Sequence, residues 1–216
     1  MRTGTLNNYV QWSKSWGGVR KCYEAKPTIL VGGFGIDLSL MPAYPNALAA
    51  GTPLKVDETA GVRSVVPLYT FRVKSVDSTE KTITVEKYEN GTTAKVGMKL
   101  IVVGDDLATA AENVAVVSAI DSSNAGYDVL TVNAVTGIEE GAVLAEAGAD
   151  SKVKVVPNAL AYCDSVLDPD SKAMDIDPVW NCYDKPVLER RMPPITASIK
   201  KALRDNECFF RFSNRK

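Results

Sequence analysis

The chain of 216 residues contains no histidine. Histidine is the commonest general base in enzymes, the commonest zinc ligand and the usual pH-sensing side chain. Its absence excludes serine–histidine and cysteine–histidine mechanisms. No other nucleophile motif or metal-ligand spacing replaces it, so we expect a protein that is not an enzyme and binds no cofactor or metal.

Cysteine is also scarce. Cys22, Cys163, Cys182 and Cys208 are widely spaced and form no CxxC pair. Zinc ribbons need such pairs, and small secreted domains carry a denser disulfide framework. We therefore expect four reduced thiols that behave as small, buried apolar side chains.

Long apolar runs and an excess of one charge are missing too. The longest apolar stretch, near residues 100–103, is far too short to cross a bilayer, and residues 1–18 lack the apolar core of a signal peptide. The net charge is −1, and the basic C-terminal run FFRFSNRK is too short for a nucleic-acid footprint. We expect no nucleic-acid or membrane partner, and a protein that is made and kept, or assembled, in a cytoplasm.

A duplicated strand pattern is present between residues 71 and 150. FRVKSVD at 71–77 recurs as AVVSAID at 115–121, and each copy is followed by a polar turn. A second strand comes next, TITVEK at 82–87 and VLTVNA at 129–134. Apolar residues alternate with polar ones in these runs, which indicates strands with one buried face and one wet face.

Each copy then continues through a glycine, Gly97 or Gly141, into a third strand. A glycine there allows a bend or a close backbone approach. Three strands cannot bury their apolar face alone, so the two copies predict a six-stranded barrel or sandwich, built as a duplicated β-meander. In the linker at 104–114, Asp106 is positioned to cap a short helical turn.

The segments on either side of the duplicated module have different residue patterns. Residues 1–44 show no sustained period and predict an arm with little core, in which GGFG at 32–35 is a turn without phosphate-loop spacing. Residues 45–70 and 151–216 are β-rich and predict a base domain split by the duplicated module at 71–150.

Local signals add detail to the base. Val65 and Val66 before Pro67 predict a strand that ends at a sheet edge, because proline cannot donate to a ladder. After the prolines at 193–194, the run ITASIKKALRDN predicts a helix of about ten residues that begins after the N-cap Thr196. The segment ECFFRF then predicts a short terminal strand. The fold class is therefore mainly β with one short C-terminal helix.

Four aspartates lie close together in DPDSKAMDID at 168–177. Carboxylates at alternating positions can bind calcium, but an EF-hand loop also needs a glycine at its sixth position and a glutamate at its twelfth. Both are absent, which favours a solvated acidic loop. The four residues are Asp168, Asp170, Asp175 and Asp177.

Three aromatic residues lie near one another in the arm, Tyr9, Trp12 and Trp16. They would suit a platform that stacks on sugars, or anchors that hold the arm on a protein partner. Aromatic side chains dominate the hot spots of protein interfaces, so we favour anchoring.

Three segments outside the duplicated module resemble the phage head-decoration protein family, the lambda-type group that trimerises on capsids. They are LAAGTPL at 48–54, ALAYCDSVLDPD at 159–170 and DKPVLERRMPPITASIKKALRDNECFFRF at 184–212. The resemblance implies one compact β-rich domain, an N-terminal arm on the shell and three subunits at local three-fold positions. Its implied partners are the major capsid protein and further copies of the chain, on the outside of a virion assembled in the host bacterial cytoplasm.

We therefore expect a structural virion protein that stabilises or decorates a phage head, with the β-module inserted into its base. Deletion of residues 1–44 should then abolish shell binding and leave both β-domains folded. The alternative is a head-fibre or tail-associated adhesion module whose barrel binds a host-surface glycan. That function needs an exposed aromatic cluster, and the insertion has only Phe71, Tyr88 and Tyr127, which argues against it.

Overall fold

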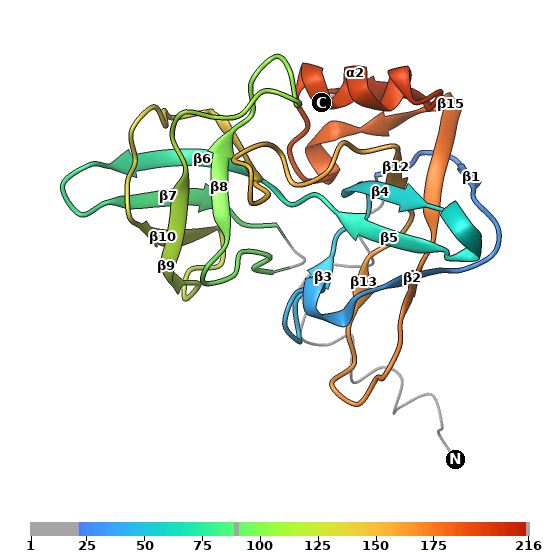
Figure 1. Cartoon of the computed structure of the whole chain (residues 1–216), viewed down its shortest axis with the longest axis horizontal. Coiled ribbons are helices and arrows are strands. Elements are labelled where there is room, and N and C mark those ends of the chain that lie inside the picture. Colours follow the sequence, from blue (N-terminus) through green and yellow to red (C-terminus); the bar gives the residue numbers. More distant parts are fainter. Residues whose placement is uncertain (1–21, 89–90, 215–216) are drawn as a thin grey trace.

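A computed structural model describes residues 22–88 and 91–214 of the chain. Over these residues the protein is mainly β, and its single α-helix lies near the C-terminus. The strands form two bodies side by side, a closed barrel and an open-sheet base (Figure 1). This confirms the predicted fold class, including the six-stranded barrel.

The barrel consists of six antiparallel strands in the order β10-β7-β6-β11-β8-β9. Every second side chain of these strands points into the barrel, is buried and fills its interior, as the alternation in the sequence predicts. The first copy contributes β6 (Thr70–Asp77), β7 (Thr82–Glu86) and β8 (Lys99–Val102), and the second contributes β9 (Ala115–Asp121), β10 (Tyr127–Val132) and β11 (Val143–Glu146).

The two copies are not meanders, so that part of the prediction is wrong. The third strand of each copy leaves its own hairpin: β8 pairs with β9 and β11, and β11 pairs with β6 and β8. Hydrogen bonds connect the two copies at the matching glycines. Gly97 N–H donates to Val117 O of the second copy (2.8 Å), and Gly141 N–H donates to Val73 O of the first copy (2.9 Å). Both glycines have positive φ, which turns the chain toward the other copy.

The linker between the copies forms no helix, contrary to the predicted helical turn. Asp106 accepts a hydrogen bond from Ala108 N–H (2.9 Å) and another from the Thr109 hydroxyl (3.1 Å). The aspartate thus closes a turn in the manner of a cap. The first turn of a helix restricts several backbone dihedral angles and forms only one hydrogen bond, so its formation is unfavourable in a short segment. The linker therefore stays a loop.

The base is an eight-stranded sheet in the order β1-β15-β12-β4-β5-β2-β14, with β16 also paired to β15. A small second sheet joins β3 (Ala47–Leu48) to β13 (Ser165–Val166), and short 3₁₀ turns lie at η1 (Leu38–Leu40), η2 (Thr59–Gly61) and η3 (Glu189–Arg191). The main strands are β1 (Thr28–Ile29), β2 (Phe34–Ile36), β4 (Pro53–Asp57), β5 (Ser64–Pro67), β12 (Ala159–Ala161), β14 (Asp175–Ile176), β15 (Pro178–Leu188) and β16 (Phe209–Ser213).

Residues 22–44 belong to this base and not to an arm with little core. They supply β1 and β2, and β2 lies inside the sheet between β5 and β14. Cys22, Phe34 and Ile36 are buried. Strands of two and three residues are too short to show a period in the sequence, which is why the segment looked irregular.

Pro67 does not mark a sheet edge. Its strand β5 lies between β4 and β2, and Pro67 itself pairs with Leu54 of β4. On the other side, β2 pairs with β5 only at Ser64 and Val65. The proline therefore lies beyond the end of β2, where its missing N–H breaks no ladder bond.

The C-terminal elements follow the prediction. Helix α2 (Ala197–Asp205) begins after Thr196, whose hydroxyl accepts a hydrogen bond from Ile199 N–H (3.3 Å). Ile199 and Leu203 are buried against the base, and β16 then pairs in parallel with β15. In the part of the chain that the structure describes, no helix is long and apolar enough to span a membrane.

Candidate functional site

The turn at Gly51 is where three distant parts of the chain meet. Ala50 N–H donates to Asp164 Oδ1 (2.8 Å), and Gly51 N–H donates to Ala161 O (2.8 Å). Gly51 has φ +82°, and a Cβ added there would lie 2.7 Å from Met192 Cβ. The segments 48–54, 159–170 and 184–212 are thus packed together as one unit, although the barrel separates the first from the other two in sequence.

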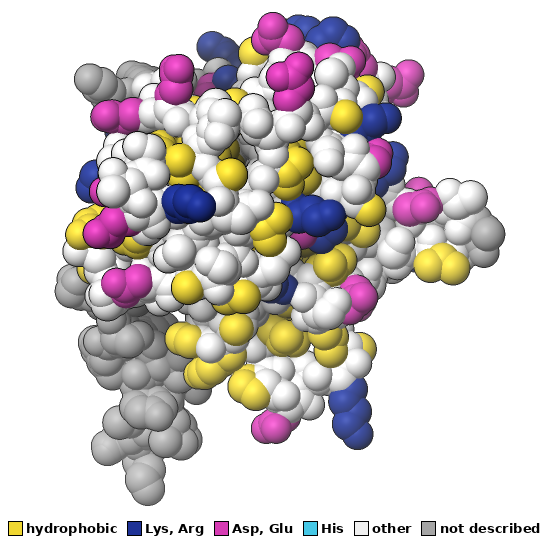
Figure 2. Space-filling model, turned by 60° about the vertical axis from the view of Figure 1, so that its left-hand side comes forward, with side chains coloured by type: hydrophobic (Ala, Val, Ile, Leu, Met, Phe, Trp, Pro, Cys, Tyr) yellow, Lys and Arg dark blue, Asp and Glu magenta, His cyan; other side chains and the backbone are white. Residues whose placement is uncertain are grey.

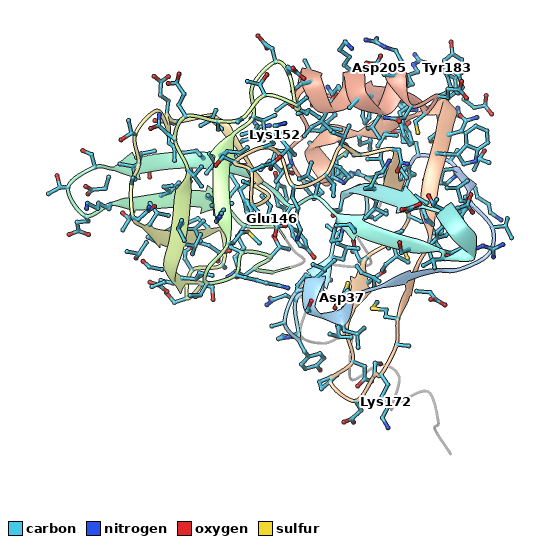
Figure 3. The ribbon with its side chains drawn as sticks, in the orientation of Figure 1. Asp37, Glu146, Lys152, Lys172, Tyr183 and Asp205 are labelled. Carbon is cyan, nitrogen blue, oxygen red and sulfur yellow. The ribbon has the colours of Figure 1, made fainter. Side chains whose placement is uncertain are left out.

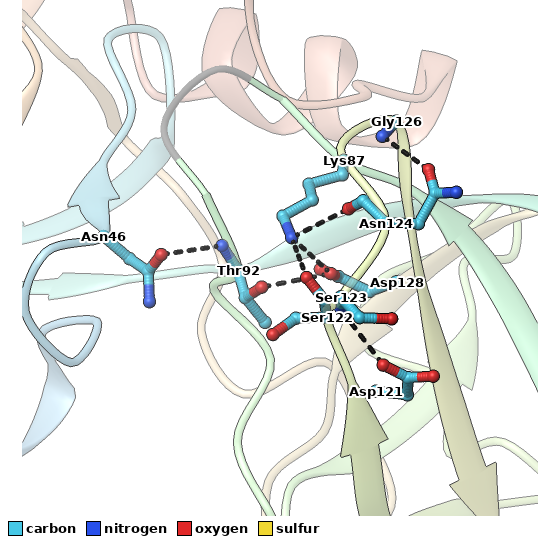
Figure 4. A network of polar contacts seen from close by, with 9 residues as sticks. All are labelled: Asn46, Lys87, Thr92, Asp121, Ser122, Ser123, Asn124, Gly126 and Asp128. Atoms are coloured by element: carbon cyan, nitrogen blue, oxygen red, sulfur yellow. Dashed lines mark hydrogen bonds and ion pairs between the residues drawn. The ribbon is translucent and has the colours of Figure 1, made fainter. Parts of the chain in front are cut away.

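A polar network fastens the barrel to the base (Figure 4). Asp128, which is 4% exposed, accepts from the Thr92 hydroxyl (3.1 Å) and pairs with Lys87 Nζ at 3.2 Å. The backbone N–H of Thr92 donates to Asn46 Oδ1 of the base (3.1 Å). The ammonium of Lys87 also donates to the carbonyls of Ser122 and Asn124, so its charge is well satisfied.

A second contact comes from the same connection between β7 and β8. Lys95 Nζ donates to the carbonyl of Ser39 in the base. Burial lowers the pKa of the Lys95 ammonium, while the nearby carboxylate of Glu146 opposes that shift. Glu146 lies at the side of the barrel that faces the base and pairs with Lys154 at 2.7 Å (Figure 3). Two polar anchors, at Thr92 and Lys95, therefore add to the apolar core that the barrel and the base share.

Replacing Lys87 by methionine is expected to destabilise the protein by about 2 kcal/mol. The Asp128 carboxylate would stay buried with the Thr92 hydroxyl as its remaining partner, and an uncompensated buried charge is costly. Urea denaturation measures the loss. The matched control Lys99→Met removes an exposed lysine of the same barrel and should change stability by less than about 0.5 kcal/mol. Equal losses in both variants would contradict the role of the pair.

The junction also contains a small cavity of about 20 Å³ between the two bodies. Thr52 and Pro193 of the base line it together with Thr70, Tyr88 and Asp128. A space of this size holds about one water molecule, so it cannot admit a sugar or a metabolite. The junction is a structural contact and not a ligand pocket.

The four aspartates of residues 168–177 are all exposed. Asp168 accepts a hydrogen bond from Asp170 N–H (3.0 Å) and closes a turn, while Asp175 lies in β14 and Asp177 follows it. Over residues 22–88 and 91–214, no group of three or more acidic or cysteine side chains is placed to hold a metal ion. The exposure of these side chains agrees with the prediction of a solvated segment, although Asp175 lies in a strand and not in a loop.

All four thiols are free, and three of them are buried. Burial raises the pKa of Cys22 to about 12 and that of Cys208 to about 11, which keeps both thiols protonated at neutral pH. Cys163 differs from the expectation of burial because its side chain is exposed.

Cys163 is therefore expected to be the one thiol that maleimide labels in the native protein. Unfolding should raise the labelling from one to four groups per chain, and Cys163→Ser should abolish it in the native state. Desolvation raises the pKa of Cys163, so its labelling rate should increase with pH well above neutrality. Mass spectrometry counts the labels, and native labelling of Cys22 would contradict the structure.

The aromatic candidates have different outcomes. Tyr9, Trp12 and Trp16 lie outside the described residues, so their role as anchors stays a prediction. In the barrel, Phe71 is buried, Tyr88 lines the junction cavity, and the ring of Tyr127 lies 4.9 Å from Lys74 Nζ. These three residues form no exposed cluster, and Figure 2 shows acidic, basic and hydrophobic side chains interspersed over the side that carries the barrel.

The sequence interpretation missed the junction residues. Asp128 lies on the buried phase of β10 with Leu130 and Val132, and Lys87 continues the buried phase of Ile83 and Val85. A charged residue at a buried alternate position in each of two segments that can pair indicates a buried ion pair. The sequence therefore contained a signal from which the pair could have been predicted.

Comparison with known proteins gives no assignment. No family model matches the chain, and neither a curated protein nor a solved structure does. A function for the chain therefore rests on its own residues and their geometry.

Proposed function

We propose that the protein is a structural virion protein that binds the outer surface of a phage capsid and stabilises or decorates the head. One observation carries the proposal. The three segments that resemble head-decoration proteins, at 48–54, 159–170 and 184–212, pack as a single unit around Gly51. Scattered chance similarities would not be expected to meet in one core.

The two bodies differ in their capacity for assembly. A closed barrel has no free strand edge, whereas terminal strands of an open sheet offer unpaired backbone groups to another chain. Among the described strands of the eight-stranded sheet of the base, β1, β14 and β16 pair on one side only. The base is thus suited to contacts with the shell, and the barrel is suited to project from it.

The N-terminal segment begins from the base. Cys22 O accepts a hydrogen bond from Leu188 N–H (2.8 Å), and Tyr23 pairs with Val187 of β15. Residues 1–21 precede this point and carry the predicted anchors Tyr9, Trp12 and Trp16. An arm that starts at the base reaches the major capsid protein on the side where the base binds, and strand addition would supply its affinity.

Individually weak contacts suffice on a lattice. A subunit that binds the shell and its neighbours gains effective concentration from each contact, so many copies act together. Closed symmetry, with three subunits around a local three-fold axis, would also cover sheet edges of the base.

Co-sedimentation of the full-length protein with expanded and unexpanded phage heads tests the proposal. Saturable binding at a copy number that matches a fixed set of lattice positions is the expected result. Absence of binding to either form, with the protein shown to be folded by circular dichroism, would overturn it.

A further inference from the structure

The edge strand β1 and the loop that follows it form a distinctive surface on the base. Figure 1 shows them at the side of the base that faces away from the barrel. Next to them lies an open groove of about 400 Å³. Ile29, Leu30 and Val31 line it, with Lys26 and Asp177 among the lining residues. The strand β1 pairs with β15 and ends the described sheet, so its outer side has no strand partner there.

Val31 stands out from this surface. Its side chain is 91% exposed, more than any other large hydrophobic side chain among the described residues. The loop around it is held in place, because Leu30 N–H donates to Pro178 O (2.8 Å) and Arg63 Nη1 donates to Gly32 O (3.0 Å). A valine presented to water on a fixed loop, beside an apolar groove, has the form of a contact residue.

The charges of the groove are balanced. Lys26 and Asp177 are both exposed, carry opposite signs, and make no ion pair with any described residue. A strongly acidic or strongly basic partner would satisfy one of them and repel the other. A surface that carries one cation and one anion is instead complementary to itself when a two-fold axis passes between the two charges.

We propose that this surface binds a second copy of the chain through a two-fold contact. An edge strand pairs with its own copy in antiparallel fashion across such an axis, which would join two base sheets at β1. Val31 of each copy enters the groove of the other, and Lys26 of each copy faces Asp177 of the other. The contact forms between two copies of the chain without a capsid. It can therefore be tested independently of the proposed capsid binding.

Sedimentation equilibrium of the full-length protein over a range of concentrations tests the contact. We expect a reversible dimer, and Val31→Asp should weaken it at least about tenfold, because a charge would be buried in the groove. The matched control Val96→Asp changes a valine that is 67% exposed in the barrel, and it should leave the dimer unchanged. Both positions are exposed, so both variants should fold.

Charge reversal identifies the pair across the axis. Lys26→Asp places two carboxylates opposite each other in both halves of the contact, and Asp177→Lys places two ammonium groups there. Each variant alone should associate at least about tenfold more weakly than the wild type. A 1:1 mixture of the two should recover association, because every opposed pair then has opposite signs.

Three results would overturn the proposal. One is a wild-type protein that stays monomeric up to about 1 mM, where even weak contacts are populated. The second is a dimer that Val31→Asp and both charge reversals leave intact, because the contact would then lie elsewhere on the molecule. Failure of the mixture to recover association, after loss in each single variant, would likewise contradict the two-fold pairing.

Discussion

A chain that lacks residues 1–44 is expected to have an unfolded base and a folded barrel. The deletion removes β2 from between β5 and β14, together with the buried side chains of Cys22, Phe34, Ile36 and Met41. Each large side chain contributes about 2 kcal/mol when fully buried. The sum approaches the whole stability of a typical domain, about 5–15 kcal/mol. The barrel keeps all six strands, which lie between Thr70 and Glu146.

Hydrogen exchange followed by mass spectrometry separates the two bodies. Peptides from β12 and β15 should exchange freely in the deletion variant, while peptides from β7 and β10 should stay protected. The control is deletion of residues 1–21, which removes no described element and should leave both bodies protected. Under the proposed function that shorter deletion loses binding to heads with the fold intact. Protection of β12 in the longer deletion would show that β2 is dispensable.

The barrel was predictable because its signal is repeated. Two copies of an alternating pattern, each with a polar turn and a matching glycine, indicate six strands without any knowledge of their neighbours. The exchange of β8 and β11 between the copies was not predictable from the same pattern. Alternation specifies which face of a strand is buried, but it does not specify which strand lies beside it.

The base was harder to derive from the sequence. Strands such as β1, β2 and β14 contain two or three residues, and their pairing depends on partners far along the chain. The helix α2 was clear because a cap, a preceding proline and a 3.6-residue period all coincide within one segment. The candidate anchors Tyr9, Trp12 and Trp16 rest on residue type alone, since they lie outside the described residues.

Substitution of Gly51 by alanine is the second prediction with a large effect. We expect the base to lose about 3 kcal/mol, from two sources. About 1 kcal/mol comes from holding a residue with a Cβ at a positive φ, which is +82° here. About 2 kcal/mol comes from overpacking, because the new Cβ would lie 2.7 Å from Met192 Cβ and 3.3 Å from Cys22 Sγ.

Gly61→Ala separates these two sources. Gly61 has a similar φ of +78°, but a Cβ there meets nothing within 4 Å. The control should therefore show the backbone cost alone, about 1 kcal/mol. Urea denaturation of both variants measures the difference, which is the cost of forcing apart the three segments that meet at Gly51. Losses of equal size would mean that Met192 moves aside freely, and that the packing at Gly51 is not what joins residues 48–54 to the C-terminal part of the base.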